Sequence, residues 1–308
     1  MPGIVLVALS AIVLGACAAG AGADPRPDPT TTSTVDPATA PDRRVETFEQ
    51  TWTDPTRAAP GAAPDRETTG RTLRVRFFVP ADGAPGPLVV FAHGNNSRPE
   101  QYAEPLTELA RRGYVVAAPA YPGTSSDAPG GASPTDLPNQ PADTSFVIDR
   151  VLAANEAPGR LRGRVDPARI AVGGHSVGGF TAGELAFSET CGDDRVDAAI
   201  IMSAGIGGCP GGRSTTRVVP LLVTHGDADT NVPYALGQAA YAEAGSPKYL
   251  LTVIGGGHSG DVRGGPGAGA RAVTDTVIAF LDAELRDAPA ALAAIRPIPG
   301  LTRWEAEP

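Results

Sequence analysis

The stretch at residues 169–179, RIAVGGHSVGG, decides the fold of this chain. Its apolar first half predicts a short buried strand, and residues 179–189 predict a helix directly after it. A Gly-x-Ser-x-Gly between strand and helix is a nucleophile elbow; Gly174 and Gly178 suit it because a β-carbon at either position would collide with the neighbouring chain. The turn lifts the Ser176 hydroxyl to the carboxyl end of a sheet, where open α/β folds bind ligands. The alternative is a glycine-rich junction without chemistry, and the remaining motifs argue against it.

Ser176 needs a base, because a serine hydroxyl is a weak nucleophile at neutral pH. Chains with this elbow carry the base after both the nucleophile and the acid. The histidines of the chain are His93, His175, His225 and His258. Only His258 has both a serine and an acid upstream, and it follows the apolar run 249–254. We therefore expect His258 to lie in the loop after a strand and to act as the base, the alternative being a loop histidine without a role.

Two aspartates compete for the position of the acid. Asp227 and Asp229 both follow the apolar run 218–223, which predicts another buried strand. The acid of a triad holds the histidine in the correct tautomer and stabilises the imidazolium. Spacing alone does not choose between the two aspartates, and Asp227, which follows a glycine, also suits a turn.

A reaction at an ester carbonyl also needs donors for the oxyanion that develops. Residues 87–92 predict a buried strand, and the loop 93–96 follows it. The elbow and this loop resemble those of α/β-hydrolases, in which the loop after this strand and the residue after the nucleophile supply the donors; the resemblance implies the backbone amides of Asn95 and Val177. Gly94 keeps the backbone of this loop free to approach a substrate.

Several motifs together resemble a known family. They are VFAHG at 90–94, RGYVV at 112–116, GHSVGG at 174–179, GDADTNVP at 226–233 and the pair Gly257-His258. On these motifs, residues 71–285 resemble the α/β-hydrolase superfamily, and most of all its dienelactone-hydrolase-related esterases, including the cutinase-like and platelet-activating-factor acetylhydrolase-like branches. The resemblance implies an α/β fold with a mostly parallel central sheet, helices on both faces and no separate lid domain. In that family the aspartate of Gly-x-x-Asp-x-x-Val-Pro is the acid, which implies Asp229.

Two departures from the family narrow the substrate. Dienelactone hydrolases use a cysteine nucleophile, whereas this chain has Ser176, so the resemblance implies carboxylic esters in place of dienelactones. Aromatic-polyester hydrolases hold one aromatic residue just after the oxyanion glycine and another after the strand that follows the elbow helix. Asn95 and the segment 203–208 stand in those places here. We therefore do not expect the hydrolysis of plastics or cutin.

The N-terminus resembles an export signal. Residues 4–19 are apolar, too few for a comfortable membrane span but suited to a signal-peptide core, although no Lys or Arg precedes them. LGAC at 14–17 resembles a bacterial lipobox, so we expect residues 1–16 to be a signal peptide and Cys17 to be lipidated and held at a membrane. Residues 17–45, rich in Pro and Thr, predict a disordered tether. The expected location is extracytoplasmic, as a cell-envelope lipoprotein; plain secretion and an uncleaved anchor are the alternatives.

Cys191 and Cys209 are the two other cysteines. An exported chain meets an oxidising compartment, where an even number of cysteines favours disulfides. Cys191 follows the predicted elbow helix and Cys209 follows the predicted strand 198–203, and the ends of adjacent elements can meet. A disulfide between them is therefore predicted, with two unpaired buried thiols as the alternative.

The net charge and the motifs of the chain argue against several other functions. The net charge of −9 disfavours a nucleic-acid partner. No Cys/His cluster has the spacing of metal ligands and no Gly-x-Gly-x-x-Gly follows a strand, so we expect neither a metal nor a cofactor. Strands and helices alternate over residues 46–290, which predicts one α/β catalytic domain, and residues 291–308 predict a surface tail.

The sequence thus predicts a serine hydrolase for small-molecule carboxylic esters. Ser176 would attack the ester carbonyl, His258 would take and return the proton, and Asp229 would orient His258. An acyltransferase or a peptidase on the same fold is an alternative within the same chemistry. A catalytically dead cell-envelope binding protein is an alternative of another class, and the presence of every triad member argues against it.

Overall fold

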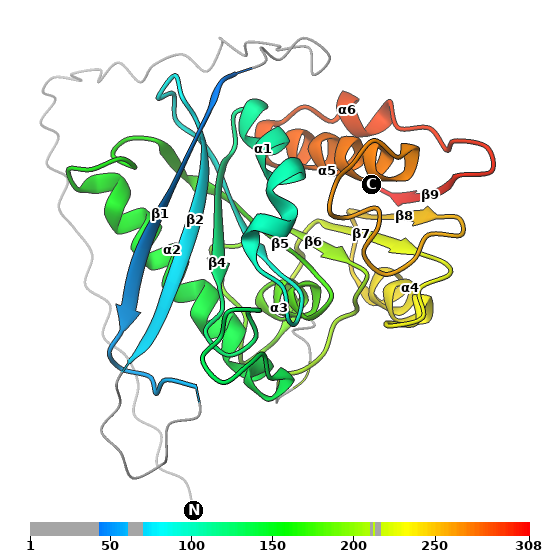
Figure 1. Cartoon of the computed structure of the whole chain (residues 1–308). Helices are drawn as coiled ribbons and strands as arrows, with labels where there is room; N and C mark the ends of the chain where they lie inside the picture. Colours follow the sequence, from blue (N-terminus) through cyan, green and yellow to red (C-terminus); the bar gives the residue numbers. More distant parts are fainter. Residues whose placement is uncertain (1–42, 61–69, 210–211, 213–216) are drawn as a thin grey trace, which may run out of the picture. The chain divides into compact units, whose positions relative to one another are not determined.

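Within the described residues, nine strands form one sheet (Figure 1). The computed structural model describes residues 43–60, 70–209, 212 and 217–308. The predicted signal peptide, Cys17 and the tether up to residue 42 lie outside these residues, so their predictions stand as made. Among the helices of the described part, none combines the length and the apolar character that crossing a bilayer requires.

The strands follow one another along the chain with helices between most of them. They are β1 (Val45–Asp54), β2 (Arg71–Pro80), β3 (Gly86–Ala92), β4 (Val115–Ala120), β5 (Val165–His175), β6 (Ala198–Met202), β7 (Leu221–Gly226), β8 (Lys248–Val253) and β9 (Thr302–Glu307). Their order in the sheet is β1-β2-β4-β3-β5-β6-β7-β8-β9. Neighbours from β4 to β8 run parallel, and β1, β2 and β9 run antiparallel to their neighbours.

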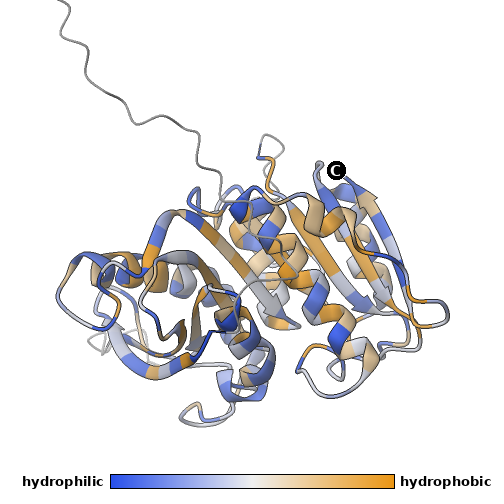
Figure 2. Ribbon diagram, turned by 90° about the horizontal axis from the view of Figure 1, so that it is seen from above, coloured by the Kyte–Doolittle hydropathy of each residue, from blue (hydrophilic) through white to orange (hydrophobic). Residues whose placement is uncertain are grey.

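Parallel strands in the centre are apolar because both of their faces are covered. Every residue of β3, β4, β6, β7 and β8 is buried, and hydrophobic residues concentrate on the central strands in Figure 2. The carboxyl ends of these strands share one edge of the sheet. The chain leaves β5, β7 and β8 at that edge, so the loops that carry Ser176, Asp229 and His258 all start there, with β6 lying between β5 and β7.

Helices cover the two faces of the sheet and build a core on each. The helices are α1 (Ala103–Arg111), α2 (Gln140–Glu156), α3 (Val177–Phe187), α4 (Tyr234–Glu243), α5 (Ala268–Arg286) and α6 (Ala290–Ala293), with short 3₁₀ turns at Pro99–Tyr102 and Pro134–Asn139. Residues of α2, α3 and α4 share one buried apolar cluster with the sheet, and residues of α1, α5 and α6 share the other. The predicted α/β architecture, with helices on both faces, is confirmed.

The C-terminal residues differ from the prediction. Residues 291–308 were expected to form a surface tail, yet they contain β9, which pairs with β8 along its whole length. In β9 only Thr302 is buried, while Trp304 is half-buried and stacks on Tyr249 with ring centroids 5.6 Å apart. An edge strand with one covered face carries charged residues on the other face, so its sequence looks like that of a surface segment.

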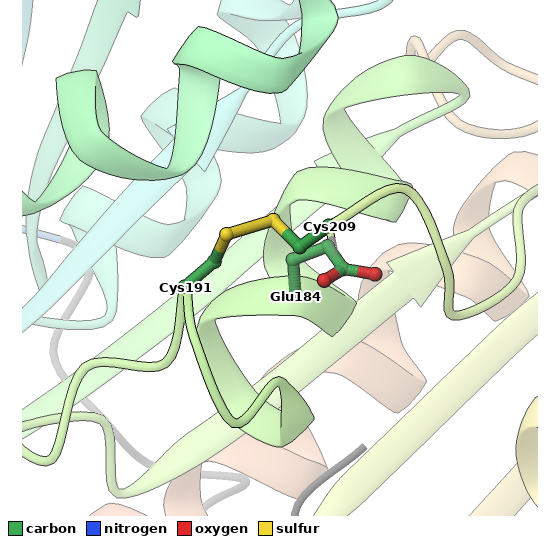
Figure 3. A group of neighbouring side chains, drawn as sticks. All are labelled: Glu184, Cys191 and Cys209. Atoms are coloured by element: carbon green, nitrogen blue, oxygen red, sulfur yellow. A yellow bond between two sulfur atoms is a disulfide. The ribbon is translucent and has the colours of Figure 1, made fainter. Parts of the chain in front are cut away.

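Cys191 and Cys209 are joined by a disulfide, with an S–S distance of 2.13 Å (Figure 3). Cys191 follows α3, and Cys209 lies in the segment after β6, so the bond ties this segment to the end of the elbow helix. The buried side chain of Glu184 lies beside them, and one of its oxygens is within 4.8 Å of both sulfurs. Because the two sulfurs are bonded to each other, neither is a thiolate that could ligate a metal.

His93 ties the ends of two neighbouring strands together. It is fully buried after β3; its Nε2 accepts from the amide of Tyr121 (3.1 Å), and its Nδ1 lies 2.8 Å from the carbonyl oxygen of Gly94. Because Nε2 is an acceptor, the ring proton lies on Nδ1 and is donated to Gly94. Burial lowers the pKa of His93 to about 4, so the ring is neutral at physiological pH.

We predict that His93→Gln weakens the pH dependence of stability. The pKa of His93 falls from 6.5 in an unfolded chain to about 4 in the fold, so only the unfolded chain binds the proton between these values, and stability is lost as the pH falls. For one histidine the loss between pH 6.5 and about pH 5 is on the order of 1.5 kcal/mol. Guanidinium titration gives the free energy of unfolding of the wild type and of the variant at both pH values. The difference in this free energy between the two proteins should be smaller by this amount at the lower pH. Equal pH dependence in the two proteins would contradict the prediction.

Candidate active site

The turn at the end of β5 has the conformation of a nucleophile elbow. Ser176 has φ 58° and ψ −123°, a region that costs a residue with a side chain about 1–3 kcal/mol. Its amide donates to the carbonyl of Met202 at the end of β6, at 2.9 Å. A β-carbon would lie 2.2 Å from the Gly178 oxygen if added to Gly174, and 2.1 Å from the Ala92 oxygen if added to Gly178. The first turn of α3 thus crosses the ends of β3 and β5 in direct backbone contact, which only glycine allows.

The carboxylate of Asp229, in the loop after β7, holds His258. Its Oδ2 lies 2.7 Å from Nδ1 of His258, and its Oδ1 accepts from the amides of Asn231 (2.8 Å) and Val232 (2.9 Å). Burial alone would raise the pKa of Asp229, but the hydrogen bonds from the Val232 amide, His258 and the Asn231 amide together lower it. The ionised carboxylate therefore favours the tautomer of His258 with its proton on Nδ1, which leaves Nε2 free to accept a proton. The His258 side chain is 14% exposed, so a substrate can reach it.

Asp227, the other candidate acid, has a different set of partners. Its Oδ1 accepts from the amide of Gly255 at 2.7 Å, and its Oδ2 forms an ion pair with Arg303 at 3.1 Å. These contacts fasten the start of the loop that carries His258 and link it to β9. The structure thus brings Asp229 to His258 and gives Asp227 a place in the surrounding loop.

His225 is a second histidine on Asp229, and sequence reasoning missed it. The His225 side chain is fully buried; its Nε2 lies 3.1 Å from the carbonyl oxygen of Val232 and 3.2 Å from Oδ2 of Asp229. Burial lowers its pKa, so the ring is neutral and its Nε2–H is shared between the two oxygens. The only sequence signal is a histidine placed at the end of the strand that precedes the acid.

The loop after β3 lies against the nucleophile. A β-carbon on Gly94 would come within 3.4 Å of Cβ of Ser176. The amide of Gly94 donates to the hydroxyl of Tyr102 at 3.2 Å, and the amide of Asn96 donates to the carbonyl of Thr124 at 2.8 Å. Within the described part of the chain, the Asn95 amide between them has no acceptor.

The two predicted oxyanion donors differ in their exposure to solvent. Asn95 is exposed in its loop, whereas Val177 is half-buried in the first turn of α3. Amides in the first turn of a helix have no acceptor within the helix. Both predicted donors thus come from segments that lie next to Ser176, which is where donors for an oxyanion would be needed.

The chain belongs to the alpha/beta hydrolase family, whose model matches residues 89–307. This confirms the superfamily that the motifs indicated. Among curated proteins, none matches the chain. Among solved structures the chain is similar to a ferulic acid esterase from Streptomyces cinnamoneus, with 25% sequence identity and a TM-score of 0.61 over 86% of this chain and 95% of that chain. Family and structural similarity together support a hydrolase of the esterase kind.

We predict that Asp229→Asn is far more damaging than Asp227→Asn. Asparagine cannot hold His258 in its required tautomer, and such a change costs about 10⁴-fold in turnover. Asp227→Asn keeps an oxygen for the Gly255 amide, and we expect it to lower kcat by less than about tenfold. Steady-state kinetics of both variants on a p-nitrophenyl ester provide the measurement. The assignment is wrong if Asp227→Asn proves the more damaged enzyme.

Proposed function

We propose that the protein hydrolyses carboxylic esters through an acyl-enzyme on Ser176. The observation that carries this proposal is the Asp229–His258 hydrogen bond beside the strained elbow. Two contacts of His175, the residue before Ser176, bring the elbow close to His258. The ring centroids of His175 and His258 are 4.7 Å apart, and Nε2 of His175 lies 2.7 Å from the His258 carbonyl oxygen. An acid, a base and a nucleophile at one sheet edge are the parts that acyl transfer requires.

In the first half of the proposed reaction, Oγ of Ser176 attacks the ester carbonyl carbon while Nε2 of His258 takes the hydroxyl proton. The amides of Asn95 and Val177 stabilise the negative charge on the carbonyl oxygen. The tetrahedral intermediate then expels the alcohol, which takes its proton from the imidazolium of His258. Asp229 keeps its negative charge throughout and stabilises that imidazolium.

In the second half, water attacks the acyl-serine. His258 takes a proton from the water and returns it to Oγ of Ser176 as the acid leaves. The same acyl-enzyme would pass its acyl group to an alcohol in an acyltransferase, or form from a peptide in a peptidase. The similarity to a ferulic acid esterase favours an ester as the substrate and water as the acceptor.

We predict that Ser176→Ala abolishes both ester hydrolysis and labelling by a fluorophosphonate. Removal of the nucleophile should cost roughly 10⁴–10⁶ in kcat. Ser126→Ala, at an exposed serine in the loop after β4, is the matched control and should react as the wild type does. Circular dichroism checks that each variant is folded. A wild type that neither labels nor turns over any ester would indicate a dead binding protein, and full activity in Ser176→Ala would indicate another nucleophile.

We propose that the acyl group of the substrate binds on an apolar patch formed by the side chains of Phe180 and Leu236. The amide of Phe180, one helical turn beyond the nucleophile, donates to the carbonyl of Ser176 at 3.1 Å. Phe180 and Leu236 both border Gly205, where a β-carbon would come within 3.5 Å and 3.2 Å of them. Leu236 is 42% exposed, so the patch is open to solvent. The described residues between β6 and β7 contain no helix that could act as a lid.

We predict that kcat/KM across p-nitrophenyl esters rises for a few carbons and then levels. Each buried methylene contributes about 0.8 kcal/mol, close to fourfold, only while it stays on the patch. Leu236→Ala should flatten the rise, while Val218→Ala, at an exposed apolar residue before the amino end of β7, should not. A rise that continues to palmitate, with a jump above the critical micelle concentration, would indicate a lipase. Faster turnover of methyl ferulate than of every aliphatic ester would make hydroxycinnamates the substrates.

A further inference from the structure

Two buried side chains outside the triad, His175 and Tyr102, join the elbow to the oxyanion loop (residues 93–96) and to the loop of the base, which follows β8 and carries His258. Nε2 of His175 lies 2.7 Å from the main-chain oxygen of His258, and Nδ1 of His175 lies 2.8 Å from the hydroxyl of Tyr102. That hydroxyl also accepts from the amide of Gly94 at 3.2 Å. His175 is 2% exposed and Tyr102 is 0% exposed. One chain of hydrogen bonds therefore runs from the oxyanion loop, through the elbow, to the loop of the base.

The donor and the acceptor of each hydrogen bond in this series follow from the groups at its two ends. A carbonyl oxygen only accepts, so Nε2 of His175 carries the ring proton and donates it to His258. Nδ1 of His175 is then an acceptor, and the Tyr102 hydroxyl donates to it. The oxygen of Tyr102 remains free to accept from the Gly94 amide. Burial lowers the pKa of His175 to about 4, which keeps the ring in this neutral form at neutral pH.

The start of the loop of the base is held by Asp227 and by the Ala228 amide, which bond to Gly255 and Gly256, but the loop is open on both sides of His258. A β-carbon added to Gly257 or Gly260, on either side of His258, would meet no atom within 4 Å. A β-carbon on Gly94 would instead lie 3.2 Å from Nδ1 of His175 and 3.3 Å from the Tyr102 hydroxyl. The open loop of the base is thus fastened at its main chain by His175, and the oxyanion loop is packed tightly on the same pair.

We propose that His175 and Tyr102 are positioning residues that set the place of His258 and of the oxyanion loop relative to Ser176. This inference rests on the proposed function, because it assigns the two residues to that reaction. Neither residue touches the substrate in this assignment. Their contribution is to hold the base and the oxyanion donors at reacting distance, where a displacement of about 1 Å costs on the order of 100-fold in rate.

The test uses variants that remove these hydrogen bonds separately and together. Tyr102→Phe deletes only the hydroxyl, His175→Phe removes both bonds of the ring, and His175→Gln keeps an N–H at about the position of Nε2. Tyr114→Phe is the matched control, because it deletes another fully buried hydroxyl, 2.6 Å from Asp282 and outside the site. Kinetics on p-nitrophenyl acetate are expressed per active site, counted with a fluorophosphonate, so that misfolded enzyme does not enter kcat.

We expect kcat to fall about 10-fold in Tyr102→Phe and about 100-fold in His175→Phe, with KM within about threefold of the wild type. His175→Gln should recover most of the loss of His175→Phe, and Tyr114→Phe should keep the wild-type kcat. If His175→Phe does not fold, Tyr102→Phe and His175→Gln decide the matter. Unchanged kcat in Tyr102→Phe, or a change in KM alone, would overturn the proposal.

Failure of this inference is separable from failure of the proposed function. If Ser176→Ala loses turnover and label while the Tyr102 and His175 variants keep the wild-type kcat, the reaction stands and the positioning role is wrong. If Ser176→Ala keeps its activity, the proposed function itself fails.

Discussion

The close crossing of α3 over the ends of β3 and β5 is the constraint on which the rest of the structure depends. Added β-carbons at Gly174 and Gly178 would lie within 2.2 Å of backbone oxygens, so the helix can start there only with glycine at both positions. That start forces Ser176 to φ 58°, and the hydrogen bond that its amide donates to the Met202 carbonyl holds it there. The strands on either side of β5, which are β3 and β6, are fully buried. In the proposed reaction the turn at the start of α3 would hold Ser176 in place before a substrate binds, as a preorganised site requires.

The histidines of the chain differ in function because their surroundings differ. His93, His175 and His225 are buried, and burial lowers the pKa of each, so they remain neutral and act as fixed donors and acceptors. His258 is the one whose side chain is partly exposed and bonded to an ionised carboxylate, Asp229. In the proposed mechanism, this setting combines access to a substrate with stabilisation of an imidazolium. The chemistry of the site is therefore determined by the environment of each imidazole, in addition to its place in the chain.

Sequence reasoning succeeded where the signal is local and failed where it depends on distant contacts. The elbow around Ser176 is a continuous motif and could be predicted from its own residues, whereas the choice of Asp229 over Asp227 came from the resemblance to a family and not from spacing. The contact of His175 with Tyr102 joins residues 73 positions apart, and no pattern in either segment predicts it. The strand β9 was mistaken for a tail, because an edge strand buries one face only. The helix α4, short and rich in alanine, likewise has no clear amphipathic pattern.

The most direct test of the central claim is to trap the acyl group on the enzyme. p-Nitrophenyl trimethylacetate, whose bulky acyl group slows hydrolysis of an acyl-serine, would be mixed with the protein and quenched in acid during turnover. Peptide mass spectrometry then locates the added trimethylacetyl mass. We predict that it appears on the peptide containing Ser176 as p-nitrophenol is released and disappears once the ester is exhausted. An unmodified Ser176 while the ester is being consumed, or an acyl group on another residue, would contradict the mechanism.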